Sequence, residues 1–470
     1  MTYNISRRRF LQNMAVGAVA ISSPFNLKAA NTTDERPNII FIMVDDLGYG
    51  DLGCFRQKKL QTPNIDRIAE EGIRFTNCYA GSTICAPSRS VLMTGQHTGH
   101  TRVRGNMCTV GGTIGYKGNR QVRRMCLTDE DITISHVLQK AGYKTCLVGK
   151  WHLGAYNPNA GPLDRGFDEF YGWTVNTAQT NGYYPSQRYR NRQLYDVAEN
   201  QNGKQGRYST DMCTDEAIDF ISKNNEQRFF LYLSFNNPHS PFQVPELGPF
   251  KERNWPEHCK IYAGMIHRLD QSIGRIMQTL KDLQIDEKTI VFFCSDNGPR
   301  SEPTQEQTEV ADFFDSNGPL RGYKRDLYEG GISVPMLVRR PGKLSAGISN
   351  DVPWYFADVL PTAAELAGIK PPENIDGKSI VPVLSEKQKD LGDRFLYWEY
   401  FESGFQQAVR WKKWKAIRLR RGGSLVLFDL SKDLAEEHDV ASEHPEVIEQ
   451  IETYLKTART ESLNWPLEPL

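Results

Sequence analysis

One short stretch of the chain combines a potential nucleophile with groups that bind an anion. The sequence Cys-Ala-Pro-Ser-Arg at residues 85–89 runs directly into an apolar helical turn at residues 91–93. Pro87 suits the first turn of a helix, because its missing N–H would be unbonded there anyway. The N–H groups and dipole at a helix start attract an anion, and Arg89 would lie one turn farther on. The stretch predicts an anion pocket containing Cys85, although a free cysteine is more often a buried core residue.

Oxygen-bearing side chains end two apolar segments of the chain. Asp45 and Asp46 follow the first segment, and Asp296 and Asn297 follow another. If these carboxylates lie close together they repel one another unless a cation is present. Hard oxygen donors suit Ca²⁺ or Mg²⁺ rather than zinc. Either pair alone could be a turn or a helix cap, but two such pairs after apolar strands predict a divalent cation site.

The elements that must position these residues alternate along the chain. Continuous apolar runs, typical of strands buried on both faces, cover residues 37–44, 144–149, 228–235, 289–294 and 332–338. Helical patterns lie between them at residues 132–141, 210–224 and 262–283. This alternation predicts an α/β fold with a large, mostly parallel sheet sandwiched by helices. Ligands of such sheets bind beyond the carboxyl ends of the strands, where four of these runs end in polar or charged residues.

Two parts of the chain depart from this alternation. Residues 96–128 and 173–208 show little periodicity, which indicates long surface insertions of the kind that contact substrates. From residue 385 onward short strand-like segments precede a helical pattern at 445–458. We therefore expect a catalytic domain over residues 37–384 and a smaller subdomain over 385–470, with an antiparallel sheet and a helix.

The N-terminus has the composition of a targeting segment. Three arginines at residues 7–9 precede Phe-Leu and a short apolar run, as in a twin-arginine export signal. We expect residues 1–30 to direct export, which implies the export machinery as a partner and a periplasmic or secreted protein; the alternative is a basic tail. The apolar run is too short to span a bilayer comfortably, and no later segment reads as transmembrane.

Charge and cysteine content limit the classes of function and of metal site that the chain can have. Lysine plus arginine and aspartate plus glutamate number 57 each, so no global field favours nucleic acid. The nine cysteines show no zinc-binding Cys-x-x-Cys pattern. Since the twin-arginine route exports folded proteins, we expect mostly reduced thiols, with Cys108 and Cys126 the first pair to check for a bridge.

The motifs together resemble those of type I sulfatases, of the alkaline phosphatase superfamily. The resemblance rests on Cys-x-Pro-Ser-Arg at 85–89 with Leu-x-Thr-Gly at 92–95, on Gly-Lys-Trp-His-Leu-Gly at 149–154, and on the order of the motifs. It implies hydrolysis of sulfate monoesters by a Cα-formylglycine, which a maturation enzyme makes from Cys85. It also implies one divalent cation, Ca²⁺ or alternatively Mg²⁺, on these ligands: Asp45, Asp46, Asp296, Asn297 and residue 85.

The resemblance also assigns catalytic roles. Arg89, Lys150 and Lys324 would stabilise the charge that develops on the sulfate. His239 would protonate the departing alcohol, and His152 would later take a proton from the nucleophile. Lys150 and His152 lie two residues apart, so they point to one face if the segment is extended, although a lone histidine is more often structural. Arg325 is the structural competitor of Lys324 in its motif.

The substrate is expected to be a sulfated carbohydrate. Long polar side chains follow the nucleophile helix, namely His97, His100, Arg102, Arg104 and Asn106. His100 and Arg104 are the chosen candidates for reading the sugar; the alternatives are an ordinary solvated loop and recognition by the insertion 173–208.

Two other functions remain open at this stage. One is a phosphodiesterase or phosphonate monoester hydrolase of the same superfamily, although two-metal relatives need additional histidine and aspartate ligands. The other is an inactive carbohydrate-binding homologue. Activity toward a sulfated aryl ester compared with a phosphorylated one would separate the three.

Overall fold

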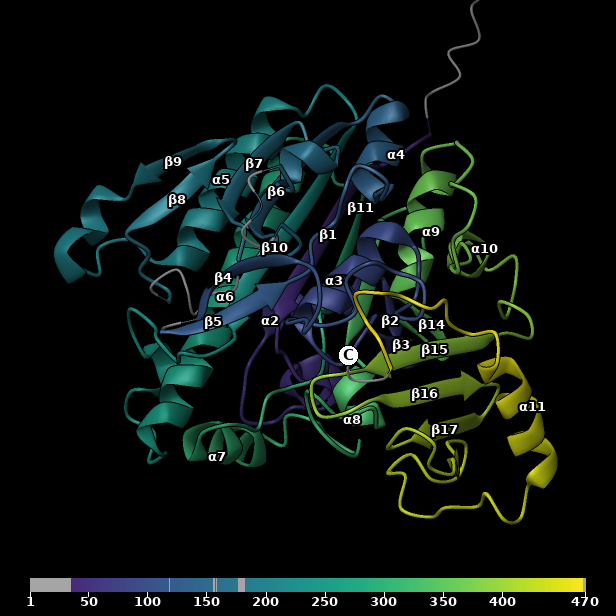
Figure 1. Ribbon diagram of the computed structural model, residues 1–470. Helices are drawn as coiled ribbons and strands as arrows, with labels where there is room; N and C mark the ends of the chain where they lie inside the picture. Colours follow the sequence, from purple (N-terminus) through teal and green to yellow (C-terminus); the bar gives the residue numbers. More distant parts are fainter. Residues whose placement is uncertain (1–34, 118, 155–156, 158, 176–181, 468–470) are drawn as a thin grey trace, which may run out of the picture. The chain divides into compact units, whose positions relative to one another are not determined.

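The structure is a computed structural model (Figure 1). It describes residues 35–117, 119–154, 157, 159–175 and 182–467. The predicted export segment, residues 1–30, lies outside the described residues. Among the helices of the described ranges, none is long and apolar enough to cross a membrane.

A sheet of ten strands forms the centre of residues 36–470, in the order β13-β2-β12-β11-β1-β10-β6-β7-β8-β9. Its central strands are β11 (Thr289–Ser295), β1 (Asn38–Asp45), β10 (Phe229–Pro238) and β6 (Lys144–Lys150). These four run parallel to one another, and β7 (Glu169–Trp173) continues the parallel set. Strands β12 (Met336–Arg339), β8 (Gln187–Arg190) and β9 (Gln193–Asp196) join antiparallel. The predicted mostly parallel sheet is confirmed.

The side chains of β1 show why the sheet is covered on both faces. Ile39, Phe41 and Met43 belong to one buried cluster, whereas the residues between them pack into another. Successive side chains of a strand point to opposite faces, so an unbroken apolar run requires apolar cover on each side. The cluster of Phe41 includes residues of α3 (Cys85–Thr94), α4 (Ile134–Lys140) and α9 (Val359–Leu366).

The second face is covered by α2 (Pro63–Glu70), α5 (Ser209–Lys223) and α6 (Glu257–Asp282). Helix α6 begins at Glu257, earlier than the pattern 262–283 predicts, because Pro256 starts it and residues 257–261 carry little of the apolar stripe. The predicted stripe is buried as expected: Met265, Ile266, Leu269, Ile273, Ile276 and Leu280. The apolar face of α6 thus closes one side of the sheet.

A separate antiparallel sheet lies near the C-terminal end of the chain. Its strands are β15 (Phe395–Tyr400), β16 (Gln406–Trp411), β17 (Trp414–Arg418) and β18 (Val426–Asp429). Helix α11 (Pro445–Leu455) shares a buried cluster with this sheet. The predicted antiparallel sheet with a helix is confirmed, while the division between residues 384 and 385 stays a prediction.

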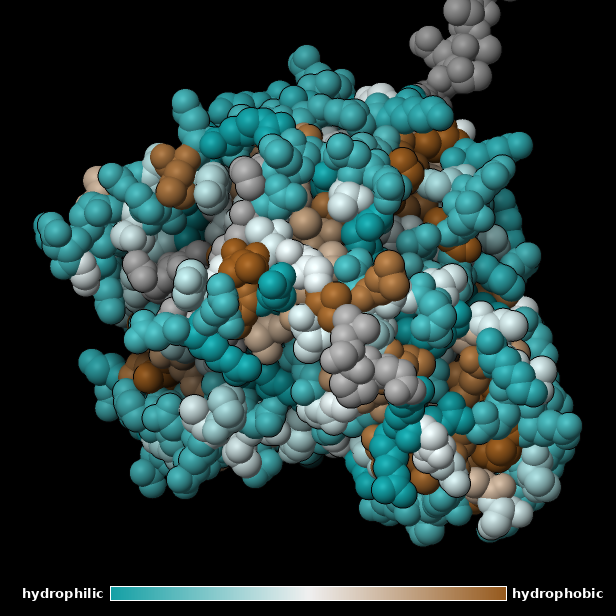
Figure 2. All heavy atoms as spheres, in the orientation of Figure 1, coloured by the Kyte–Doolittle hydropathy of each residue, from teal (hydrophilic) through white to brown (hydrophobic). Residues whose placement is uncertain are grey.

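The remaining elements are short. The strands are β2 (Ile73–Phe75), β3 (Cys78–Tyr79), β4 (Thr113–Lys117), β5 (Arg120–Arg124), β13 (Ile348–Asn350) and β14 (Trp354–Tyr355). The helices are α7 (Gln305–Phe314), α8 (Glu329–Ile332) and α10 (Val381–Leu384). All nine cysteines are free thiols, Cys108 and Cys126 included. On the face drawn in Figure 2, hydrophobic residues lie in separate patches among hydrophilic ones.

Candidate active site

The site lies at the carboxyl edge of the four central strands. Asp45 is the last residue of β1, Lys150 the last of β6, and Asp296 directly follows β11. Parallel pairing in register brings these strand ends together, with Met43 opposite both Ser234 of β10 and Cys294 of β11. Residues that are far apart in the sequence therefore meet at one place, as the pattern of strand ends predicts.

The helix α3 delivers the nucleophile position to this edge. Cys85 is its first residue, and the entire helix is buried. The backbone N–H of Ala86 donates to Asn106 Oδ1 at 2.9 Å, which holds the start of the helix against the loop that follows it. One turn on, Arg89 donates to Asp296 Oδ2 through Nε at 3.0 Å and through Nη2 at 2.7 Å. The predicted Arg89 thus anchors a carboxylate of the cation site.

Two lysines reach the same centre. Lys324 Nζ lies 3.2 Å from Cys85 Sγ and also pairs with Asp46. Lys150 Nζ donates to Asp45 Oδ2 at 2.6 Å, and Cys85 Sγ lies 3.4 Å from the other oxygen of that carboxylate. The competitor Arg325 pairs instead with Glu302, away from the sulfur.

The predicted cation ligands form one buried cluster. Ligand atoms of Asp45, Asp46, Cys85 and Asp296 all lie within 4.8 Å of one another. Asp46 Oδ2 and Asn297 Oδ1 are buried without a hydrogen-bond partner, so two oxygen atoms are available to a cation. Burial and then the charge of Asp45 raise the pKa of Asp296. These oxygens fit a hard divalent cation.

The pKa of Asp46 is shifted in the opposite direction to that of Asp296. Burial opposes its ionisation, but the positive charges around it, that of Lys324 above all, lower the pKa of Asp46 well below its usual range. Its backbone adopts a left-handed φ of 66° directly after β1. Such a conformation is uncommon for a residue other than glycine, and it turns the second carboxylate toward the same centre as the first.

Both predicted histidines are buried beside these groups. His152 Nε2 accepts from Arg124 Nη1 at 2.8 Å, and burial, with the charges of Lys150 and Arg124, holds the pKa of His152 well below its usual range. His239 Nε2 lies 3.6 Å from Asp46 Oδ2, and burial is the main cause that lowers the pKa of His239 to about 3. Both imidazoles are therefore neutral near pH 7. Nε2 is the unprotonated nitrogen of each ring, because His152 accepts there from Arg124 and His239 Nδ1 donates to the Ser240 carbonyl.

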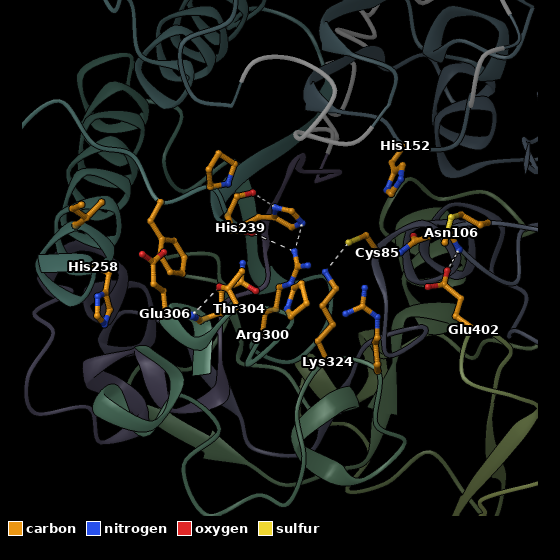
Figure 3. Close-up of a pocket in the computed structure, with 18 of the residues that line it drawn as sticks. Cys85, Asn106, His152, His239, His258, Arg300, Thr304, Glu306, Lys324 and Glu402 are labelled. Atoms are coloured by element: carbon orange, nitrogen blue, oxygen red, sulfur yellow. Dashed lines mark hydrogen bonds between the residues drawn. The ribbon is translucent and has the colours of Figure 1, made fainter. Parts of the chain in front are cut away.

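A cavity of about 730 Å³ opens over this centre (Figure 3). Its walls include the predicted Cys85, His152, His239 and Lys324. Figure 3 shows Cys85, His239 and Lys324 converging on the same space. Lining residues that sequence reasoning missed or did not choose include Asn106, Met107, Arg124, Glu257, His258, Arg300, Glu306, Arg325 and Glu402. The sequence offered a signal for Arg300, because this residue lies three positions after the predicted ligand Asn297. It offered none for Arg124, which lies within an aperiodic insertion.

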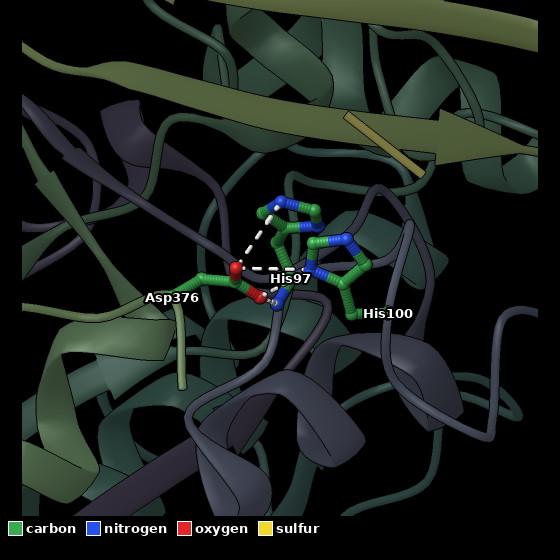
Figure 4. A group of neighbouring side chains, drawn as sticks. All are labelled: His97, His100 and Asp376. Atoms are coloured by element: carbon green, nitrogen blue, oxygen red, sulfur yellow. Dashed lines mark hydrogen bonds and ion pairs between the residues drawn. The ribbon is translucent and has the colours of Figure 1, made fainter. Parts of the chain in front are cut away.

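The two residues chosen for sugar recognition lie elsewhere. Arg104 is 2% exposed, and its Nη1 donates to Glu399 Oε1 at 3.0 Å. His100 Nδ1 lies 2.9 Å from Asp376 Oδ1 (Figure 4). Neither lines the cavity, and no residue of the described part of 173–208 lines it either. The structure therefore brings Asn106, and not His100 or Arg104, from this loop to the site.

His97, His100 and Asp376 form a hydrogen-bonded group rather than a metal centre (Figure 4). His97 Nδ1 accepts from the Gly99 N–H at 3.1 Å, so the neutral ring carries its proton on Nε2. That Nε2 faces Asp376 Oδ1 at 3.5 Å. A metal would need the lone pair of Nε2, which this tautomer does not offer.

Comparison with known proteins gives the chain its family. The family model Sulfatase matches residues 37–369, and the model for the C-terminal part of N-sulphoglucosamine sulphohydrolase matches residues 322–461. The chain is 32% identical to human N-acetylgalactosamine-6-sulfatase over 384 residues, covering 78% of this chain and 69% of the relative. It is 30% identical to human steryl-sulfatase over 468 residues, covering 84% and 78%.

A solved structure extends the likeness to the fold. The crystal structure of Ps i-CgsB in complex with k-i-k-neocarrahexaose superposes with a TM-score of 0.76 at 29% identity, covering 92% of this chain and 95% of that one. These likenesses run through both the large sheet and the C-terminal sheet. Because the first family match alone takes in most of the chain, the chain belongs to the sulfatase family and is a sulfuric ester hydrolase.

Proposed function

We propose that the protein removes sulfate from a sulfated carbohydrate, using a formylglycine made from Cys85 and a single divalent cation. The observation that carries the proposal is the position of Cys85 Sγ, 3.4 Å from Asp45 and 3.2 Å from Lys324, in the wall of the cavity. A nucleophile between a carboxylate-held cation and a lysine is where a sulfate ester would bring its negative charge.

The environment of Cys85 supports its conversion. Burial raises the pKa of the Cys85 thiol to about 12, although Lys150 and Lys324 oppose the shift. An unmodified thiol here stays protonated at neutral pH and is a poor nucleophile, because the thiolate is the reactive form. Hydrated formylglycine would supply hydroxyl groups in place of the thiol. The proposal therefore makes the maturation enzyme an obligatory partner.

The cation is proposed to be Ca²⁺, with Mg²⁺ as the alternative. Asp45, Asp46, Asp296 and Asn297 offer only oxygen, and an exclusively oxygen-bearing set suits these ions better than zinc. When bound, the cation would act as a Lewis acid toward the sulfate and neutralise the buried carboxylates. The partnerless oxygens of Asp46 and Asn297 support this ligand set.

The remaining side chains have roles that their positions support. Lys150 and Lys324 would bind the sulfate oxygens, and Arg89 would keep Asp296 in place through its paired hydrogen bonds. His239 would hold a proton at Nε2 for the leaving alcohol once the negative substrate is bound. His152, neutral because burial lowers its pKa, would accept the proton from the nucleophile at Nε2, in place of the hydrogen bond that this atom accepts from Arg124.

A carbohydrate is the proposed substrate class. The cavity volume of about 730 Å³ is large for a small aryl ester and falls within the range of sites that enclose drug-sized ligands. Relatives are named for N-acetylgalactosamine-6-sulfate, and a structural neighbour is a complex with a neocarrahexaose. Export through the twin-arginine route, with a periplasmic or secreted location, is part of the same proposal.

The test is sulfate release from a panel of sulfated monosaccharides and oligosaccharides. The expected result is turnover of at least one sulfated sugar, and of an aryl sulfate far faster than the matching aryl phosphate. A Cys85→Ala variant is the background control. Faster turnover of the aryl phosphate would favour the phosphodiesterase alternative. The absence of any turnover by protein in which Cys85 has become formylglycine would favour an inactive homologue.

A further inference from the structure

Buried arginines in this protein usually meet a carboxylate. Carboxylates pair with four of them: Arg89, Arg104, Arg165 and Arg339. Within the described ranges, three others have no carboxylate partner. Arg188 lies over the Trp173 ring at 4.5 Å, and Arg410 donates to the carbonyl of Lys413. The third, Arg124, lines the cavity that holds Cys85.

Arg124 is the last residue of β5 and only 4% exposed. Its Nη1 donates to His152 Nε2 at 2.8 Å, and its Nε is buried without any partner. A guanidinium cannot lose its proton in a protein, so burial cannot neutralise it. An uncompensated buried charge is costly, and the folded chain supplies no counter-charge here. The counter-charge is expected to come from a ligand in the cavity.

The sulfate ester that reacts already has its own cations. Arg89, Lys150 and Lys324 surround the nucleophile, and each pairs with a carboxylate of the proposed cation site. Arg124 stands apart from that set, because its side chain donates to His152 and not to Cys85 or an aspartate. It also comes from the insertion 96–128 rather than from a central strand. Its position suits a group of the substrate beside the reacting ester.

We propose that Arg124 binds a second anionic group of the substrate, a carboxylate or a further sulfate on the sugar next to the ester that is cleaved. The inference rests on the proposed function and narrows its substrate class to sugars with two acidic groups. An oxyanion in the cavity would accept a charge-assisted hydrogen bond from a terminal nitrogen of Arg124, because Nε is fully enclosed by the protein.

The charge of the surrounding wall agrees with this class. Arg300, half-buried, donates to Ser240 Oγ at 3.3 Å and, like Arg124, has no carboxylate partner among the described residues. Three acidic residues line the cavity, Glu257, Glu306 and Glu402. Glu402 accepts the Asn106 N–H at 2.9 Å, and its charge acts on Arg325. The cavity wall carries four positive side chains, namely Arg124, Arg300, Lys324 and Arg325, against these three acidic ones, and this small positive excess agrees with an anionic substrate.

The test compares matched substrates. One pair consists of sulfated disaccharides that differ only in a neutral or a uronate neighbour; the other consists of a monosaccharide with one or two sulfates. We expect wild-type kcat/KM to be about 10-fold or more higher for the doubly anionic member of at least one pair, mainly through KM. The pair that shows the preference identifies the group as a carboxylate or a sulfate.

Arg124→Gln should bring this preference to about one. The variant also removes a partner of His152, so all rates will fall by a common factor, which cancels in the ratio. Arg124→Lys keeps the charge without the planar guanidinium and should retain part of the preference. The matched control is Arg123→Gln, because Arg123 is exposed and donates to the Gly111 carbonyl; it should leave the ratio unchanged.

Two results would overturn the inference. Equal wild-type kcat/KM values for the two members of each pair would mean that the protein does not recognise a second anionic group. An unchanged preference in Arg124→Gln would mean that another side chain binds the second anionic group. Arg124 would then position His152 or bind the reacting sulfate. Should Arg124→Gln fail to fold, Arg124→Lys decides by the same ratio. Turnover of an aryl sulfate by wild-type protein checks the proposed function separately, because that substrate has one anionic group.

Discussion

Lys324 Nζ lies 3.2 Å from Cys85 Sγ across 239 residues of sequence, and the same ammonium pairs with Asp46. One lysine thus joins the proposed nucleophile to the proposed cation ligands. Its backbone is fixed as well, since the Lys324 N–H donates to the Pro299 carbonyl at 2.8 Å. A sulfate bound between the two would meet a positive charge that is already oriented, at little further cost in ordering.

The first prediction concerns residue 85. In active protein, peptide mass analysis should find this residue about 18 Da lighter than cysteine, or near the cysteine mass when hydrated, the difference between a thiol and an aldehyde. Protein made without the maturation enzyme should turn over poorly. Cys54→Ser, at a half-buried cysteine that does not line the cavity, is the control and should keep full activity. Full activity in Cys85→Ala would refute the assignment.

The second prediction concerns the cation. Asp296→Asn should lose the bound ion and reduce activity at least about 100-fold, because the remaining carboxylates then lack a full ligand set. The matched control is Asp286→Asn, near the opposite end of β11, where the carboxylate pairs with Arg339. Metal analysis should give one Ca²⁺ or Mg²⁺ per wild-type chain and the same for the control. Two zinc ions per chain would contradict the ligand assignment.

The third prediction revises the part played by Arg104. Arg104→Gln removes a buried charged partner of Glu399, which keeps Arg459 and the Tyr397 hydroxyl, and should destabilise the fold by about 3 kcal/mol. Thermal melting checks the loss, with the partly exposed Arg102→Gln as a milder control. Activity on sugar and aryl sulfates should change in the same proportion. A selective rise in KM for the sugar would restore Arg104 as a specificity residue.

The fourth prediction concerns stability in acid. Burial lowers the pKa of His97 to about 4, against the opposing charge of Asp376, while an unfolded histidine titrates near pH 6.5. Between these values the unfolded chain binds a proton that the folded protein does not, so stability falls as the pH drops from about 6.5 to 4. The loss is up to about 3 kcal/mol.

Denaturant unfolding over this pH range measures the effect. His97→Gln should flatten the slope, whereas the exposed His438→Gln should leave it as in the wild type. An unchanged slope in His97→Gln would show that other groups cause the acid sensitivity. Well above pH 6.5 His97→Gln should differ from wild type by a constant amount only, because position 97 then binds no proton in either state.

The sequence by itself determined the fold class and the centre of the site. Unbroken apolar runs require cover on both faces of a parallel sheet, and parallel strands end at a common edge. Asp45, Lys150 and Asp296 were therefore expected to lie close together at that edge, independently of the conformation of the loops. The start of a helix at Cys85 followed from local chemistry, since proline and the residues after it favour that position.

Only the tertiary structure decided which residues of the aperiodic loops reach the cavity. His100, Arg104 and Arg124 are similar candidates by composition, and their neighbours in space come from segments 276, 295 and 28 residues away. No periodic pattern encodes such pairings, because a loop without repeating apolar positions has no preferred face. The packing of the whole chain brings Arg104 against a buried carboxylate in β15. It brings Arg124 against His152 and into the wall of the cavity.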